Sequence, residues 1–173
     1  MKTTEIIKLM ESAITASLYA GDKILKIYEE EDFEVQIKSD NSPLTKADRE
    51  AHNIIMSYLE KTNLPVLSEE GKDIEYNTRK DWEWFWMVDP LDGTKEFIKR
   101  NGEFTVNIAL IHNDKPAAGV IYVPVLKQLY IAENNTGSFK IENIDISTIQ
   151  DTSFEKTALS GRKLPLNESP VVF

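Results

Sequence analysis

Residues 84–94 read WFWMVDPLDGT, an unbroken apolar run that ends in two aspartates, a glycine and a threonine. A run of this kind predicts a central strand that is covered on both faces. Asp89 then lies at the C-terminal end of the strand, where α/β folds place their ligands, and Asp92 can turn back toward it. Gly93 lets a ligand approach the backbone closely. A helix that starts here would leave the N–H groups of Gly93 and Thr94 free for a phosphate.

Hydrophobic periodicity predicts the elements on either side of this stretch. Apolar residues recur at helical spacing in two segments, and they follow strand patterns in several others. Helices are expected over residues 4–29 and 46–61, strands over residues 32–38, 66–68, 103–111, 117–123 and 128–132, and loops over residues 70–81 and 142–157. Thr45 is a natural N-cap for the second helix, with Asp48 three residues further on. Gly21 allows the first helix to pack closely against a neighbour.

The composition narrows the class of function. The chain has 173 residues, no cysteine, two histidines and a formal net charge of −9. The lack of cysteine excludes disulfides, zinc-thiolate sites and thiol nucleophiles. The acidic balance disfavours nucleic acid as a partner, because the field of the chain repels phosphate unless metal ions stand between them.

The location of the protein is an expectation from the same composition. No apolar run approaches the roughly 20 residues that span a bilayer. The amphipathic start of the chain carries acids, unlike a signal or transit peptide. We therefore expect a cytoplasmic protein. Peripheral contact with an inner membrane stays open, and so does the oligomeric state.

A second acidic pair, Glu69-Glu70, follows the short strand expected at residues 66–68. If this strand neighbours residues 84–88 in one sheet, Glu69 lies near Asp89. Carboxylates crowded in this way repel one another unless a cation sits among them. Hard oxygen ligands without histidine or cysteine favour Mg²⁺, and two such ions roughly 4 Å apart can promote phosphoryl transfer.

Each candidate also has a purely structural interpretation. Asp48 can be a capping residue worth on the order of 1 kcal/mol, Glu69-Glu70 a solvated loop pair, and Asp92 the cap of the following helix. The histidines and alternating tryptophans are expected to be ordinary boundary or packing residues, namely His52, His112, Trp82, Trp84 and Trp86.

Three blocks in order resemble the inositol monophosphatase family of Mg²⁺-dependent, lithium-sensitive phosphatases. They are LTKAD at residues 44–48, SEE at 68–70 and DPLDGT at 89–94. The continuations TKEF at 94–97 and GEFTVNIA at 102–109 look closest to the branch that hydrolyses 3′(2′),5′-bisphosphate nucleotides. The resemblance implies an α+β fold, in which layered helices pack on a largely antiparallel sheet. This is the N-terminal domain of the inositol monophosphatase and fructose bisphosphatase fold.

The resemblance also implies roles by position. Glu69, Asp89 and the Leu91 carbonyl would hold one Mg²⁺, and Asp89 and Asp92 a second. Thr94, hydrogen-bonded to Asp48, would orient and deprotonate the attacking water, while the amides of Gly93 and Thr94 bind the scissile phosphate. The substrate-facing residues would be Glu69, Leu91, Asp92, Gly93 and Thr94.

The implied reaction belongs to sulfur assimilation. The substrate would be adenosine 3′,5′-bisphosphate or its sulfated precursor. The bisphosphate would be hydrolysed to AMP and phosphate by in-line attack of a metal-bound water, without a covalent phosphoenzyme. Two alternatives stay open: hydrolysis of inositol monophosphate, and a truncated module that binds metal or phosphate without turnover.

The end of the chain departs from the family pattern. A later tryptophan-aspartate motif of the family, whose aspartate is a further metal ligand, does not follow Thr94. The apolar residues 171–173 after Pro170 look like the first half of a buried strand. We therefore expect a metal-binding catalytic N-terminal domain over residues 1–160, and the start of a second, truncated domain over residues 161–173.

Overall fold

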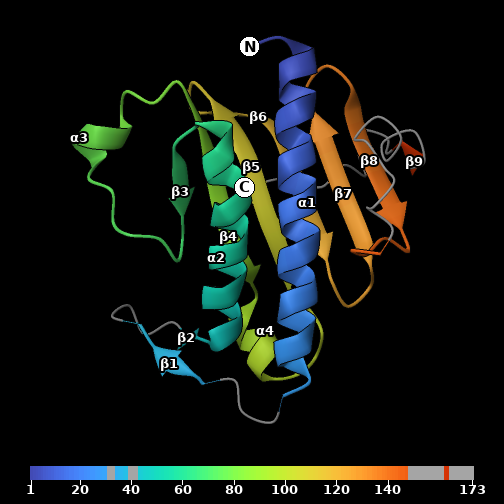
Figure 1. Cartoon of the computed structure of the whole chain (residues 1–173). Helices are drawn as coiled ribbons and strands as arrows, with labels where there is room; N and C mark the ends of the chain where they lie inside the picture. Colours follow the sequence, from blue (N-terminus) through green and yellow to red (C-terminus); the bar gives the residue numbers. More distant parts are fainter. Residues whose placement is uncertain (31–33, 39–42, 148–161, 164–173) are drawn as a thin grey trace.

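Two long helices lie side by side on one face of a seven-stranded sheet (Figure 1). This computed structural model describes residues 1–30, 34–38, 43–147 and 162–163. The helical elements are α1 (Thr3–Tyr28), α2 (Lys46–Leu59), the 3₁₀ turn η1 (Glu60–Thr62), α3 (Tyr76–Arg79) and α4 (Thr94–Ile98). The strands are β1 (Gln36–Ile37), β2 (Pro43–Leu44), β3 (Val66–Ser68), β4 (Trp84–Asp92), β5 (Thr105–His112), β6 (Lys115–Val123), β7 (Gln128–Glu133), β8 (Gly137–Glu142) and β9 (Arg162–Lys163).

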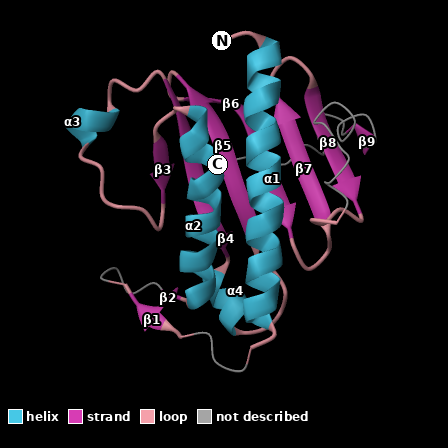
Figure 2. Cartoon of the chain, in the orientation of Figure 1, coloured by secondary structure: helices cyan, strands magenta, loops and turns pink. Residues whose placement is uncertain are grey.

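The sheet runs in the order β3-β4-β5-β6-β7-β8-β9 (Figure 2). β3 pairs with β4 in parallel, and every other neighbouring pair of this sheet is antiparallel. The expected α+β fold of helices on a largely antiparallel sheet is therefore confirmed. None of the helices in the described ranges is long and apolar enough to cross a membrane.

The core lies between the two helices and the sheet. α1 and α2 turn their apolar stripes toward the strands, as helices that cover one sheet face do. Large side chains from both layers are fully buried, among them Met10, Leu18, Ile55, Trp86 and Leu110. The burial of these side chains fixes α2 over β4, and α2 thereby brings its first turn to the end of β4.

Gly21 sets the distance between α1 and β6. A Cβ placed at Gly21 would lie 2.4 Å from Cε1 of Tyr122. The expectation that this glycine permits close packing is confirmed.

β4 departs from the sequence expectation of a strand covered on both faces. Its side chains alternate: Trp86 and Val88 are buried under the helices, whereas Met87 is 39 % exposed on the opposite face. The expectation is wrong for this part of the strand, because only one face of the sheet carries helices in the described residues. An apolar run does not by itself show that both faces are covered.

Several local expectations also change. Of the strand expected over residues 32–38, residues 32 and 33 lie outside the described residues. The described part contains the short strand β1, which pairs with β2 and in which Ile37 is 66 % exposed. The second helix ends at Leu59 and continues as η1. The expected loop at 70–81 contains α3, and β8 was not anticipated.

Much of the C-terminal expectation lies outside the described residues. These include residues 148–157 of the expected loop, the 160/161 domain boundary and the apolar end at 171–173. The division into two domains stays a prediction. β9, which falls within the proposed second part, pairs with β8.

Candidate active site

The parallel pair of β3 and β4 brings the acidic residues together. Ser68 lies opposite Val88, and the N–H of Glu69 donates to the Val88 carbonyl at 3.0 Å. The carboxyl ends of parallel neighbours meet at the same sheet edge, so Glu69 leaves β3 where Asp89 continues β4. The expectation that these two strands are neighbours is confirmed.

An irregularity in β4 holds Asp89 and Asp92. The pairing with β5 shifts register between these two residues. Oδ1 of Asp89 accepts a hydrogen bond from the Leu91 N–H at 3.2 Å, and Oδ2 of Asp92 accepts one from Nδ2 of Asn107 at 3.1 Å. Asn107 had not been singled out in the sequence, because no local pattern shows that it lies opposite Asp89 on the next strand.

Gly93 is required at the turn from β4 into α4. Its φ is +95°, in the left-handed region that favours glycine. A Cβ here would also lie 2.7 Å from the carbonyl oxygen of Glu103. This geometry places Thr94 at the first position of α4, directly beside the start of α2.

Asp48 joins α2 to this turn. Its side chain is 1 % exposed. Oδ2 accepts two hydrogen bonds from Thr45, from N at 2.7 Å and from Oγ1 at 2.5 Å, while Oδ1 accepts from Oγ1 of Thr94 at 3.0 Å. The Thr94 hydroxyl is also 3.3 Å from the Leu91 carbonyl oxygen. Asp48 is therefore both the capping residue and the partner of Thr94.

The electrostatics of the carboxylates reflect their burial and crowding. Burial, with the negative charges of Glu69 and Asp92 next, raises the pKa of Asp89 to about 7. Burial also raises the pKa of Asp48, against hydrogen bonds from Thr45 and Thr94 that favour its charged form. A cation among these groups would offset the burial and the repulsion that together raise the pKa of Asp89.

Lys38 is a neighbour of the site that sequence reasoning missed. Its Nζ lies 3.1 Å from Oε1 of Glu69 and 2.5 Å from Oε1 of Glu70. Burial raises the pKa of Glu70, and the Lys38 ammonium opposes this shift. A lysine some thirty residues earlier in the sequence gives no local signal of this contact, so only the fold reveals it.

The residues present fit a hard cation in their chemistry. Glu69, Asp89 and Asp92 line one pocket of about 450 Å³, together with Asp73 and Asn107. Carboxylate and carbonyl oxygens are the ligands that Mg²⁺ prefers. Among the described residues, however, no group of three or more acidic or histidine side chains is already arranged to hold an ion. Here the carboxylate of Glu69 pairs with Lys38 instead.

Trp84, Trp86 and His112 behave as packing residues. Trp86 is buried and its Nε1 donates to Oγ1 of Thr62 at 3.0 Å. Trp84 stacks on His112, with ring centroids 3.9 Å apart. These contacts show how Trp84 and Trp86 pack in the fold.

Comparison with known proteins identifies curated relatives of the chain. It is 49 % identical over 127 residues to the 3′(2′),5′-bisphosphate nucleotidase CysQ of Salmonella typhimurium, covering 72 % of this chain and 51 % of that protein. It is 53 % identical over 116 residues to CysQ of Escherichia coli K12, covering 65 % and 47 %. The chain spans about half the length of the curated relatives it matches.

A solved structure and a family pattern agree with these relatives. The crystal structure of CysQ from Bacteroides thetaiotaomicron is 50 % identical, with a TM-score of 0.81, and the match covers 95 % of this chain and 59 % of that one. The sequence pattern of the inositol monophosphatase family matches residues 6–170, nearly the whole chain. The chain therefore belongs to the inositol monophosphatase family.

Proposed function

We propose that this chain forms the metal-binding part of a Mg²⁺-dependent phosphatase that hydrolyses 3′(2′),5′-bisphosphate nucleotides. The observation that carries the proposal is the hydrogen bond from Thr94 to the buried carboxylate of Asp48, beside the acidic pocket of Glu69, Asp89 and Asp92. The names of the CysQ relatives support the substrate class. The partner is then a small phosphorylated nucleotide, and the acidic chain disfavours nucleic acid.

The proposed metal ligands are those that the resemblance to the family implies. Glu69, Asp89 and the Leu91 carbonyl would hold one Mg²⁺, and Asp89 and Asp92 a second. Bound there, the ions would neutralise the crowded carboxylates and polarise the phosphate oxygens. The amides of Gly93 and Thr94 would meet the scissile phosphate at the start of α4.

The chain's own residues would move the proton of the attacking water. Thr94 accepts that proton as its own hydroxyl proton passes to Oδ1 of Asp48, along the existing 3.0 Å hydrogen bond. The water oxygen forms a bond to phosphorus as the bond from phosphorus to the 3′ oxygen breaks, and the leaving oxygen takes a proton from solvent. The products are AMP and phosphate. The raised pKa of Asp48 supports its use as a proton acceptor.

Phosphate release from adenosine 3′,5′-bisphosphate tests the proposal. We expect turnover by the chain with Mg²⁺, and loss of at least about 100-fold with EDTA or in Asp89→Asn. Inositol monophosphate serves as the competing substrate, and we expect it to be the poorer one. No turnover of either substrate by the parent chain would contradict catalysis by this chain. Binding of Mg²⁺ without turnover would favour a non-enzymatic module.

A further inference from the structure

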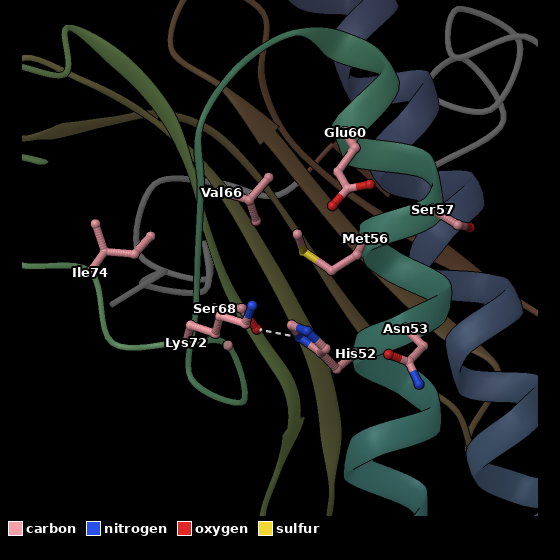
Figure 3. A pocket seen from close by; sticks show the side chains of 10 residues that line it. His52, Asn53, Met56, Ser57, Glu60, Val66, Ser68, Lys72 and Ile74 are labelled. Carbon is pink, nitrogen blue, oxygen red and sulfur yellow. Dashed lines mark hydrogen bonds between the residues drawn. The ribbon is translucent and has the colours of Figure 1, made fainter. Parts of the chain in front are cut away.

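His52 of α2 contacts β3 on the side away from the acidic pocket. Nδ1 of His52 lies 2.9 Å from Oγ of Ser68, the last residue of β3. Figure 3 shows this hydrogen bond at the edge of a second pocket, of about 600 Å³, between α2 and β3. Ser68 lines both this pocket and the acidic one. A single strand therefore separates His52 from the proposed metal site.

The chain after Ser68 makes a tight turn that carries both glutamates. The N–H of Gly71 donates to the Ser68 carbonyl at 3.0 Å, so Glu69 and Glu70 are the two central residues of a four-residue turn. A Cβ placed on Gly71 would lie 3.8 Å from Cε1 of His52. The imidazole thus hydrogen-bonds to one end of the turn at Ser68, while Gly71 at the other end lines the same pocket and leaves room beside the ring.

The same helix anchors the proposed proton acceptor. Asp48 and His52 are four residues apart on α2, so they share one face of the helix. Asp48 is fixed by Thr45 and Thr94. The first part of α2 therefore positions Asp48, the partner of Thr94, and also supports the Ser68–Gly71 turn that bears Glu69.

The chemistry of the contact suits a support rather than a ligand. Burial lowers the pKa of His52, although the charge of Glu60 opposes this shift. The neutral ring has one donor and one acceptor nitrogen, and the Ser68 hydroxyl can serve as partner to either. Groups that hold metal ligands in place typically change metal affinity 10- to 100-fold when they are removed.

We propose that His52 is a positioning residue of the phosphatase site, which holds the Ser68–Gly71 turn so that Glu69 faces Asp89. This inference rests on the proposed function. It replaces the expectation that His52 is an ordinary boundary residue. His52 itself touches neither metal nor substrate, and acts through Ser68 and the turn.

Four variants of the chain test the proposal. His52→Phe keeps a ring but loses the hydrogen bond, and Ser68→Ala removes the other partner. His52→Asn places a polar atom near the position of Nδ1. Met56→Leu is the matched control, because Met56 lines the same pocket on the same helix. Mg²⁺ binding is measured by calorimetry, and hydrogen exchange of the amides of residues 69–71 is measured without metal.

We expect His52→Phe and Ser68→Ala to weaken Mg²⁺ binding about 10-fold and to speed exchange of the turn amides by a similar factor. The double variant His52→Phe/Ser68→Ala should bind Mg²⁺ no more weakly than either single variant, because both changes remove the same hydrogen bond. His52→Asn should stay within about threefold of the parent, and Met56→Leu should match it. A role only in stability would lower Tm without this pattern of metal affinity and rescue.

The outcomes separate the two proposals. Parental Mg²⁺ binding and parental exchange in His52→Phe would overturn the positioning role. If the parent chain bound no Mg²⁺, the proposed function would fail, and exchange alone would decide the role of His52. Faster amide exchange in His52→Phe, together with a parental exchange rate in His52→Asn, would then support the positioning role. Unchanged exchange in His52→Phe would overturn it.

Discussion

Asp48 uses its two carboxylate oxygens for different partners. Oδ2 accepts the capping-box hydrogen bond from the Thr45 N–H and a second one from the Thr45 hydroxyl, and Oδ1 remains for the hydroxyl of Thr94. The cap fixes the rotamer of the carboxylate and thereby aims Oδ1 across to the start of α4. The capping role of Asp48 and its proposed role as proton acceptor therefore require the same orientation of the carboxylate.

Thr94 offers a direct test of this geometry. Thr94→Val keeps the shape but loses the hydroxyl, and it leaves a buried oxygen of Asp48 without its donor. We expect kcat to fall by about 10²- to 10⁴-fold and stability to fall by about 1 to 3 kcal/mol. Steady-state kinetics should show KM and Mg²⁺ dependence near parental values.

Thr94→Ser is the matched control, because it keeps the hydroxyl and should retain most of the activity and stability. A parental kcat in Thr94→Val would show that the Thr94 hydroxyl takes no part in moving the proton.

The residues of the site differ in how visible they are in the sequence. Asp89, Asp92 and Glu69 stand in short motifs next to predicted strands, so local pattern and one assumption about strand order find them. Lys38 reaches the same place from a segment with no motif, and Asn107 from a block at 102–109 that gives no sign of a contact with Asp92. Their roles depend on which strand lies beside which, and this is a property of the tertiary fold.

Among the elements, α1 lies close to the sheet because Gly21 has no side chain at the point of contact. Alanine at position 21 would be the better helix former by about 1 kcal/mol. Yet its Cβ would meet the ring of Tyr122 at 2.4 Å and Pro124 at 3.1 Å. Overpacking of a filled core typically costs about 1 to 3 kcal/mol. The packing term therefore outweighs the propensity term.

We expect Gly21→Ala to lower the free energy of unfolding by up to about 2 kcal/mol in urea denaturation, because the overpacking cost exceeds the gain in helix propensity. Asn53→Ala is the control, because Asn53 is exposed on α2 and the change gives only the propensity gain, about half a kcal/mol. Tyr122→Leu should restore part of the loss in the double variant. An increase in stability in Gly21→Ala would show that α1 can move away from β6 at little cost.

The segment after β8 is tied to the turn between β6 and β7. Nζ of Lys127 lies 2.8 Å from Oδ2 of Asp145, and the Ile144 N–H donates to the Lys127 carbonyl. Hydrogen bonds from Lys127 and Ser147 lower the pKa of Asp145 to about 2. An acid with a depressed pKa stabilises the fold above its unfolded pKa, and this contribution is lost as the pH falls toward the folded value.

We expect Asp145→Asn to cost a few tenths of a kcal/mol at pH 7, because water still reaches both side chains of the pair, which are 54 % and 30 % exposed. The difference from the parent should narrow as the pH falls from about 4 toward 2. Chemical denaturation at several pH values measures this difference in the free energy of unfolding. Lys127→Gln should show the same cost at pH 7, and the double variant should lose no more stability than either single variant. A difference that does not depend on pH would show that the loss comes from packing.

At the scale of the whole molecule, the layer order is only partly encoded in local pattern. Helical and strand periodicity predict α1, α2 and most strands, because each pattern reflects one buried face. For the strand of residues 84–88, the expectation that both faces are covered is wrong. Its apolar residues fill both faces, yet only the Trp86 and Val88 side lies under helices in the described residues. What covers a second face depends on partners that a strand's own sequence does not specify.

The two faces of β4 therefore differ in the energetic cost of the same substitution. Val88 is 3 % exposed, and Val88→Thr buries a hydroxyl, for which we expect a loss of about 1 to 3 kcal/mol. Met87→Thr, one residue away on the 39 % exposed face, should change the free energy of unfolding by no more than about 0.5 kcal/mol. Both variants keep the backbone pairs with β5, which makes each the control for the other. Equal losses in urea denaturation would mean that the Met87 face is covered in solution, and the sequence expectation for this strand would then be correct after all.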